Sequence, residues 1–183
     1  MLNPSAVVPV ASHLRTITRA AHDTVDAAFS RLDLADRADY ARFLLAHAAA
    51  TAAVEAVLSG DPTLPRWRPR LALLQNDLAT LELAPPPPLP FDPGGTSAAR
   101  LGALYVLEGS RLGGAVLVKR VYPGAPTAFL SARHDPGEWR AFLRAMDERG
   151  VGQTPDWLDT VACGASACFA LYTASSQALP VPH

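Results

Sequence analysis

Three glycines interrupt a stretch that otherwise has the composition of a long packed helix. The stretch is Leu104–Arg120, LYVLEGSRLGGAVLVKR, and it contains Gly109, Gly113 and Gly114. Each glycine inside a helix costs about 1 kcal/mol relative to alanine, and alanine is used freely elsewhere in this chain. Gly109 and Gly113 are four residues apart and therefore share one helix face. A face without side chains lets another helix or a planar ligand approach the backbone, and the glycines alone do not decide between the two.

A second group of residues able to do chemistry lies near the start of the chain. Residues 14–31, LRTITRAAHDTVDAAFSR, carry one histidine, His22. Most metal sites need several ligands, but a single axial histidine can hold haem iron. Asp26 lies one helical turn after His22, where its carboxylate can accept a hydrogen bond from the second ring nitrogen. Arg15 and Arg19 share this stripe and are suited to bind the propionate carboxylates of haem. Without haem, His22 would be a packed histidine with no chemical role.

Other candidate sites are weaker. His47 also lies at helical spacing among apolar residues, but its face has no arginine pair and no acidic partner, so we expect a partly buried, packed histidine. Cys163 and Cys168 are five residues apart on an expected helix, and we interpret them as buried free thiols. The sequence has no nucleophile elbow, phosphate loop, CxxC or HExxH motif. It also lacks the paired Glu-x-x-His motifs that a di-metal helical bundle needs.

The two motifs together resemble those of a known family. RAAHDTVDAAF around His22, followed about eighty residues later by YVLEGSRLGG, is similar to the haem oxygenases. The similarity is greatest to the short bacterial members that supply biliverdin to bacteriophytochromes, and it extends from about Leu14 to about Leu179. In that family the first helix supplies the proximal histidine, and a glycine-rich distal helix lies over the other face of the haem.

This resemblance implies a role for each residue of the motifs. It makes His22 the proximal iron ligand and Asp26 its acidic neighbour. Animal-type members carry an aspartate between the distal glycines, whereas this chain has Ser110, which we interpret as a subfamily trait and a candidate donor to the distal water network. The remaining matches are two arginines near the propionates and three glycines of the distal helix: Arg15, Arg19, Gly109, Gly113 and Gly114.

The resemblance also implies a reaction. Haem would be both substrate and cofactor, and it would be cleaved to biliverdin, carbon monoxide and iron with O2 and electrons from a donor such as a ferredoxin or a reductase. Gly109, Ser110 and Gly113 would then form the catalytic wall, since a wall of backbone lacks the strong acid that favours O–O cleavage. Two alternatives stay open: a non-catalytic haem carrier or sensor with the same pocket, and a haem-free helical relative.

The motifs need helices to position them, and the rest of the sequence supplies helical patterns. Apolar residues recur at helical spacing, and no segment shows the alternation of a strand. We therefore expect an all-α fold, a single-domain bundle of roughly six or seven helices. A flexible lead-in is expected over 1–11 and a Pro/Gly-rich internal loop over 84–96. The expected helices cover about 12–31, 40–58, 66–83, 97–121, 136–149 and 155–177.

Two further expectations concern polar residues between these helices. Arg66, Arg68 and Arg70 form a small basic cluster, which we expect on a solvated face where a redox partner could bind. His134 lies in a stretch expected to be irregular or a short helix, and we expect it to be exposed.

Composition limits the classes of function. The 183 residues are 49% hydrophobic, which favours a compact globule with a sizeable core. The net charge of −1 argues against non-specific nucleic-acid binding, which needs a basic surface. The first residues lack the basic and apolar regions of a signal peptide, and we expect no membrane span. These features fit a protein of the bacterial cytoplasm.

Overall fold

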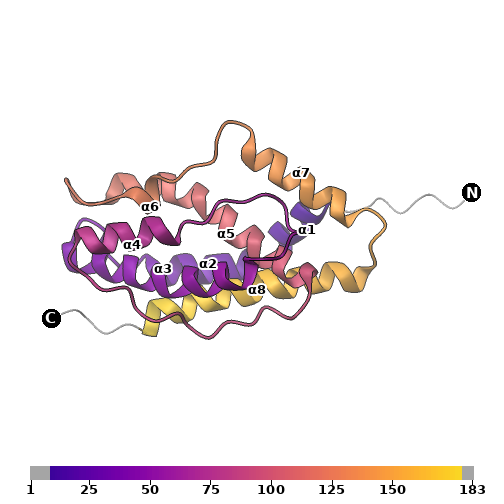
Figure 1. Ribbon diagram of the computed structural model, residues 1–183, viewed down its shortest axis with the longest axis horizontal. Helices are drawn as coiled ribbons and strands as arrows, with labels where there is room; N and C mark the ends of the chain where they lie inside the picture. The colour runs from indigo at the N-terminus through magenta and orange to yellow at the C-terminus, as the bar shows by residue number, and fades with distance from the viewer. Residues whose placement is uncertain (1–8, 179–183) are drawn as a thin grey trace, which may run out of the picture.

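The computed structural model describes residues 9–178, and over these residues it is helical with no strand (Figure 1). The all-α prediction is confirmed. The helices are α1 (Val10–Ile17), α2 (Arg19–Phe29), α3 (Arg37–Leu58), α4 (Leu71–Thr80), α5 (Ser97–Leu117), the 3-10 helix η1 (Val118–Arg120), α6 (Ala128–Ser131), α7 (Glu138–Gly150) and α8 (Pro155–Ala178).

The centre of the bundle is the crossing of α5 and α8, the most extensive helix contact among the described residues. Two glycines make this crossing possible. A Cβ atom at Gly102 would overlap the carbonyl oxygen of Val161, and one at Gly164 would overlap that of Ala99. Because the two helix backbones touch, only glycine fits at either position. Helix α8 also packs against α2 and α3, so it supports both the histidine motif and the glycine motif.

Helix α3 is buried on most of its circumference. Its N-terminus is capped by Asp36, whose carboxylate accepts hydrogen bonds from the backbone amides of Ala38 and Asp39. We expected no membrane span from the sequence, but by length and composition alone α3 and the stretch Ser97–Arg120 could cross a membrane. However, 67% of the most apolar window of α3 and 50% of that of Ser97–Arg120 are buried inside the bundle. Core packing therefore accounts for their apolar character.

The first expected helix is divided in two. Backbone helicity is interrupted at Thr18, where φ is −91° and ψ is 2°. The buried Thr18 hydroxyl donates to the carbonyl oxygen of Leu14 at 2.8 Å, a local bond that competes with regular helix geometry. The prediction of one continuous helix was wrong because residue periodicity does not register such a side-chain bond. Arg15 consequently lies on α1, whereas Arg19 and His22 lie on α2.

The third expected helix begins later than its apolar spacing indicated. Residues 66–70 are not helical, and α4 starts at Leu71. Pro69 explains the difference, since the residue before a proline is disfavoured in the helical region. Arg70 was expected on a solvated face, but only 2% of it is exposed. That prediction was wrong, and the path of this segment carries Arg70 into the core.

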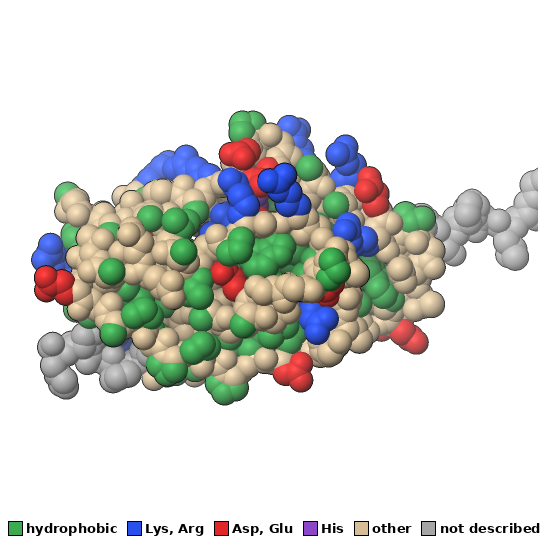
Figure 2. All heavy atoms as spheres, viewed as in Figure 1, with side chains coloured by type: hydrophobic (Ala, Val, Ile, Leu, Met, Phe, Trp, Pro, Cys, Tyr) green, Lys and Arg blue, Asp and Glu red, His purple; other side chains and the backbone are tan. Residues whose placement is uncertain are grey.

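The surface in Figure 2 shows Lys and Arg side chains along its upper edge, over α7 and the loop before it, with acidic side chains among them. Near the middle of this face, hydrophobic side chains predominate (Figure 2).

Both cysteines are free, but Cys163 is exposed whereas Cys168 is buried, so the expectation of burial was correct for Cys168 only.

Candidate functional site

Among the residues that the structure describes, no other helix covers one face of the second half of α5. Within residues 9–178 and outside the backbone of α5 itself, a Cβ atom at Gly113 would meet no atom within 4 Å, and one at Gly109 would touch only Cη2 of Trp139, at an ordinary 3.6 Å. The neighbouring apolar side chains Leu112 and Val116 are 49% and 64% exposed. Large exposed apolar side chains that cluster on one helix are typical of a binding surface. Helix packing therefore does not explain Gly109 and Gly113, and we call this region the open face of α5.

Gly114 differs from its neighbour. A Cβ atom there would lie 3.0 Å from the carbonyl oxygen of Leu130, on the short helix α6. This glycine therefore serves the close approach of α6 to α5. Its predicted role in ligand binding is not tested by this contact and stays a prediction.

His22 is presented by α2 with one nitrogen already engaged. Its Nδ1 lies 3.3 Å from Oδ2 of Asp26, one turn later, and the two side chains are 58% and 70% exposed. The edge of the Phe169 ring, from α8, packs against the imidazole with the ring centroids 5.8 Å apart. A carboxylate at Nδ1 favours the tautomer that leaves the Nε2 lone pair free. His22 is thus oriented, accessible and chemically able to hold a metal ion through Nε2.

The basic residues of the first motif lie toward solvent. Arg15 and Arg19 are both exposed. Burial raises the pKa of the half-buried Tyr105, while the charge of Arg15 lowers it, so the Arg15 guanidinium acts on the hydroxyl of Tyr105. Tyr105 precedes Gly109 by one helical turn on α5. This link between α1 and the open face was not predicted, because Tyr105 has the pattern of an ordinary packing residue.

The structure places the two motifs on a common support without joining them directly. Helices α2 and α5 both pack on α8. His22 is not among the atoms within 4 Å of the Cβ position at Gly109 or Gly113. The arrangement fits a ligand that is contacted from two sides, by a histidine on one helix and by bare backbone on the other. The donor set suits haem: a free imidazole nitrogen, an open apolar face and two accessible arginines.

Ser110 is held by a polar network that joins it to the buried Arg70. Its Oγ accepts a hydrogen bond from Nη2 of Arg70 and donates one to the carbonyl oxygen of Leu107 at 2.7 Å. Nη2 of Arg70 also donates to that carbonyl, at 2.7 Å. Burial lowers the pKa of Arg70 to about 10, so its guanidinium is still charged at neutral pH. The Ser110 hydroxyl is therefore fixed, with its proton already used and an oxygen lone pair left to accept.

Glu55 anchors Arg70 from α3. Its carboxylate accepts from the backbone amide of Arg70 at 2.6 Å and from that of Leu71 at 3.2 Å. The carboxylate thus caps the N-terminus of α4, where the helix dipole favours a negative charge. Burial raises the pKa of Glu55, and the two amide bonds oppose that rise. The contact between Glu55 and Arg70 was not predicted from the sequence. A single glutamate among the alanines and valines of α3 could have indicated a buried polar contact.

His47 is enclosed by aromatic rings, as expected for a packed histidine. Its Nδ1 donates to the carbonyl oxygen of Phe43 at 2.9 Å, and its ring centroid is 4.0 Å from that of Phe43 and 4.5 Å from that of Phe29. Burial lowers the pKa of His47 to about 4, so the ring is neutral at neutral pH. No group of three or more His, Cys, Asp or Glu side chains in the described part of the chain could hold a metal ion.

Comparisons with known proteins agree with the family that the sequence resembles. No family model matches the chain. The chain is 36% identical over 115 residues to a protein named heme oxygenase from Xanthomonas campestris pv. campestris (strain 8004), a match covering 57% of this chain and 66% of that protein. The match thus spans about two thirds of that relative's length. The fold is similar to the NO- and CO-bound heme oxygenase from Neisseria meningitidis, with a TM-score of 0.78, 26% identity and coverage of 93% of this chain and 91% of that one.

Proposed function

We propose that this chain, which belongs to the haem oxygenase family, cleaves haem oxidatively to biliverdin, carbon monoxide and ferrous iron with O2 and external electrons. The observation that carries the proposal is the open face of α5. Two glycines in the middle of a helix destabilise it and are not needed for packing, since Gly109 and Gly113 have ordinary or empty surroundings. A flat ligand lying on the backbone accounts for both.

Each predicted site residue has a place in this account. His22 would hold the iron through Nε2, and Asp26 would fix the ring through Nδ1. The exposed guanidinium groups of Arg15 and Arg19 would bind the propionates. Bound haem would supply both the iron that takes up O2 and the macrocycle that is oxidised.

On the opposite side, the glycines would bring the backbone of α5 close to the ligand. Gly109 and Gly113 would form this wall, and Gly114 would allow α6 to support it from behind. Ser110 would accept a hydrogen bond from a water at the wall, because its own proton points to the Leu107 carbonyl. This role differs from the donor role expected from the sequence. The buried positive charge of Arg70 makes the Ser110 oxygen a fixed point for such a water.

The partners follow from the reaction and from the sequence resemblance. We propose an electron donor of the ferredoxin or reductase class, action in the cytoplasm, and delivery of biliverdin to a bacteriophytochrome. The last point rests only on the similarity of the motifs to those of the short bacterial members. Covalent chromophore assembly in a mixture of this protein, hemin, a reductant and an apo-bacteriophytochrome would support it, and release of biliverdin without assembly would contradict it.

The test of the proposed function is a hemin titration of the wild type beside His22→Ala. We expect saturable one-to-one binding by the wild type, and an altered Soret band in His22→Ala that added imidazole restores, because imidazole replaces the missing ligand. His47→Gln is the matched control and should leave the Soret band unchanged. Turnover with ascorbate or a ferredoxin system should then release biliverdin and carbon monoxide. A complex that stays in the oxy form would instead indicate a carrier or sensor, and absence of hemin binding would indicate a haem-free relative.

A further inference from the structure

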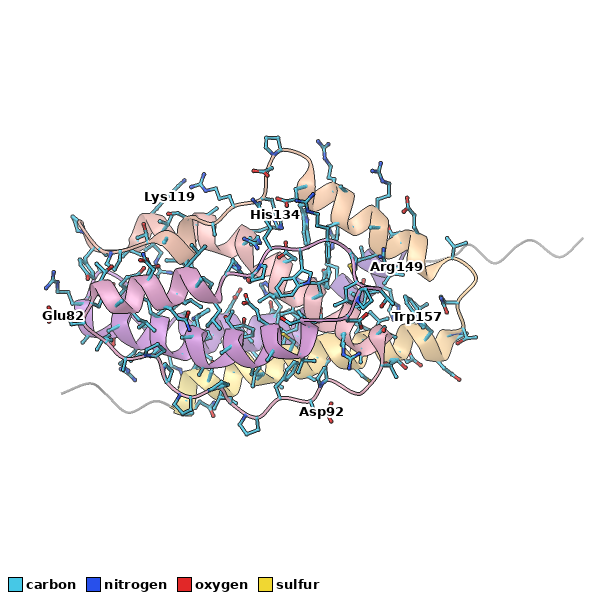
Figure 3. The ribbon with its side chains drawn as sticks, viewed as in Figure 1. Glu82, Asp92, Lys119, His134, Arg149 and Trp157 are labelled. Carbon is cyan, nitrogen blue, oxygen red and sulfur yellow. The ribbon has the colours of Figure 1, made fainter. Side chains whose placement is uncertain are left out.

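Three ionisable side chains form a buried cluster next to the open face of α5. Glu108, Arg111 and His134 have side chains that are only 4%, 2% and 6% exposed. Arg111 Nε donates to both carboxylate oxygens of Glu108, at 3.1 and 3.2 Å, and Nε2 of His134 lies 2.9 Å from Oε2. We call these residues the Glu108 cluster. His134, labelled in Figure 3, was expected to be exposed, and its 6% side-chain exposure shows that the prediction was wrong.

The cluster joins three parts of the chain that are far apart in sequence. Glu108 and Arg111 come from α5, and His134 comes from the loop before α7. Nη2 of Arg111 also donates to the carbonyl oxygen of Arg68, in the segment before α4. Burying a charge costs several kcal/mol unless it is paired, so three buried groups that are joined through Glu108 are a costly arrangement with a specific geometry.

The geometry of His134 is determined by its partner. An ionised carboxylate only accepts hydrogen bonds, so Nε2 of His134 carries the hydrogen that points to Glu108. Nδ1, the other ring nitrogen, is buried and has no hydrogen-bond partner among the residues that the structure describes. The ring is therefore held from one side by Glu108 and on its face by Trp139, with ring centroids 5.4 Å apart.

Trp139 connects the Glu108 cluster to the open face of α5. Its Cη2 lies 3.6 Å from the Cβ position at Gly109 and is, in the described part of the chain, the one atom beyond the α5 backbone within 4 Å of it. The indole also stacks on Phe142, with centroids 5.5 Å apart, and tilts toward Tyr105 at 6.1 Å. The contacts form a ring that starts and ends on α5. Glu108 binds His134, His134 packs against Trp139, and Trp139 contacts Gly109, the residue that follows Glu108.

An outer set of bonds supports the same loop. Nη2 of Arg68 donates to Oε2 of Glu138 at 2.6 Å and to the carbonyl oxygen of Arg133 at 3.0 Å. These side chains are 43% and 34% exposed, so solvent weakens their ion pair. The buried Glu108 cluster is consequently the stronger determinant of where the loop and Trp139 lie.

We propose that Glu108, Arg111 and His134 are positioning residues that hold Trp139 against Gly109 and so set the shape of the open face. The consequence for haem rests on the proposed function, whereas the placement of Trp139 does not. The cluster acts through Trp139. Losing it frees the indole to move away from Gly109 or over it, and the volume above the glycines changes.

The first test uses the apoprotein labelled with 5-fluorotryptophan. The chain has three tryptophans, and Trp139→Phe identifies the fluorine resonance of Trp139. In His134→Leu we expect this resonance to shift or broaden while those of Trp67 and Trp157 stay in place. In His134→Gln the amide nitrogen can donate to Glu108 from nearly the position of Nε2, so the Trp139 resonance should stay close to its wild-type position.

An unchanged Trp139 resonance in a folded His134→Leu protein would overturn the proposal. If that variant does not fold, Glu108→Gln decides, because it keeps the shape of the side chain and removes the charge that pairs with Arg111. The Trp139 resonance must then move in Glu108→Gln, and no movement would overturn the proposal.

The second test uses the haem-loaded protein and separates this inference from the proposed function. We expect His134→Leu to lower kcat several-fold with a smaller change in KM, and His134→Gln to restore kcat. Azide affinity of the ferric complex should change in parallel, since azide occupies the space above the glycines. Movement of Trp139 in apoprotein that binds no hemin would uphold the positioning role and refute the proposed function. Normal hemin turnover by the wild type, together with an unmoved Trp139 in His134→Leu, would support the proposed function and refute the positioning role.

Discussion

In the first half of α5, Gly102 lies against the backbone of α8, whereas in the second half a Cβ atom at Gly113 would meet no atom of another described segment within 4 Å. Both are glycines of one continuous helix, and both carry the same intrinsic cost of about 1 kcal/mol relative to alanine. In the first half, the close approach of two helices offsets that cost. At Gly113, no contact in the described structure offsets it, which is the expected signature of a surface kept bare for a ligand. Surroundings, not residue type, therefore distinguish a packing glycine from a binding glycine.

The largest expected effect on stability comes from a substitution in the first half of α5, where the helix packs against α8. Gly102→Ala places a methyl group on the carbonyl oxygen of Val161, and neither backbone can move without shifting a helix. We expect the free energy of unfolding to fall by about 3 kcal/mol, at the upper end of overpacking effects. Urea denaturation of the apoprotein, followed by circular dichroism, measures it. A Gly102→Ala protein as stable as the wild type would show that α5 and α8 are not in backbone contact.

A pH effect probes the aromatic core behind the open half, where His47 lies 5.6 Å from the ring of Phe129 on α6. The pKa of His47 is about 4 in the folded state, below the ordinary value for histidine, so the unfolded chain binds the proton more tightly. His47 therefore contributes stability that is present above about pH 6.5 and is lost as the pH falls toward 4. The loss is about 3 kcal/mol between pH 7 and 4.

The measurement is the difference in unfolding free energy between the wild type and His47→Gln over this pH range. Other groups titrate in both proteins and largely cancel in that difference. Parallel stability curves for the two proteins would contradict the burial of His47.

A smaller effect probes the polar support of the open half. Ser110→Ala removes one acceptor from Arg70, which keeps its bond to the Leu107 carbonyl. We expect a loss of about 1 kcal/mol in unfolding free energy. We also expect a change in the acid–alkaline transition of the ferric haem complex, because the water that Ser110 accepts from is lost. An unchanged transition in a haem-binding Ser110→Ala protein would remove Ser110 from the site.

The smallest effect has the opposite sign. Gly109→Ala and Gly113→Ala should each raise the stability of the apoprotein by up to about 1 kcal/mol, because a methyl group fits at both positions and alanine is the better helix former. Thermal unfolding of the two variants beside Gly102→Ala gives the contrast directly. Destabilisation by Gly113→Ala would mean that the open face is covered in solution.

The sequence was sufficient for the class of fold and for the two motifs, because both depend on local spacing. Helical periodicity predicted the all-α fold, and the four-residue interval predicted the proximity of His22 and Asp26 that the structure shows at 3.3 Å. The roles of the predicted site residues in haem binding stay predictions.

What the sequence did not predict depends on contacts between distant segments. Spacing could not separate Gly113 from Gly114, since only the position of α6 makes one open and the other packed. Arg70 and His134 have the composition of surface residues, yet Glu55 and Glu108 bind them in the interior. Glu55 accepts from the backbone amide of Arg70, and Glu108 contacts the ring of His134. Both contacts join residues that are far apart in sequence, so neither partner carries a local signal beyond an isolated charge among apolar residues.

The most direct test of the central claim is hemin binding by Gly113→Leu. The leucine side chain would project into the open face, where no other segment of the described wild-type structure has an atom within 4 Å of the Cβ position. We expect the apoprotein to unfold at nearly the wild-type free energy, while hemin affinity falls by about tenfold or more, equivalent to about 1.4 kcal/mol. Wild-type hemin affinity in a correctly folded Gly113→Leu protein would contradict the claim that this face receives the haem.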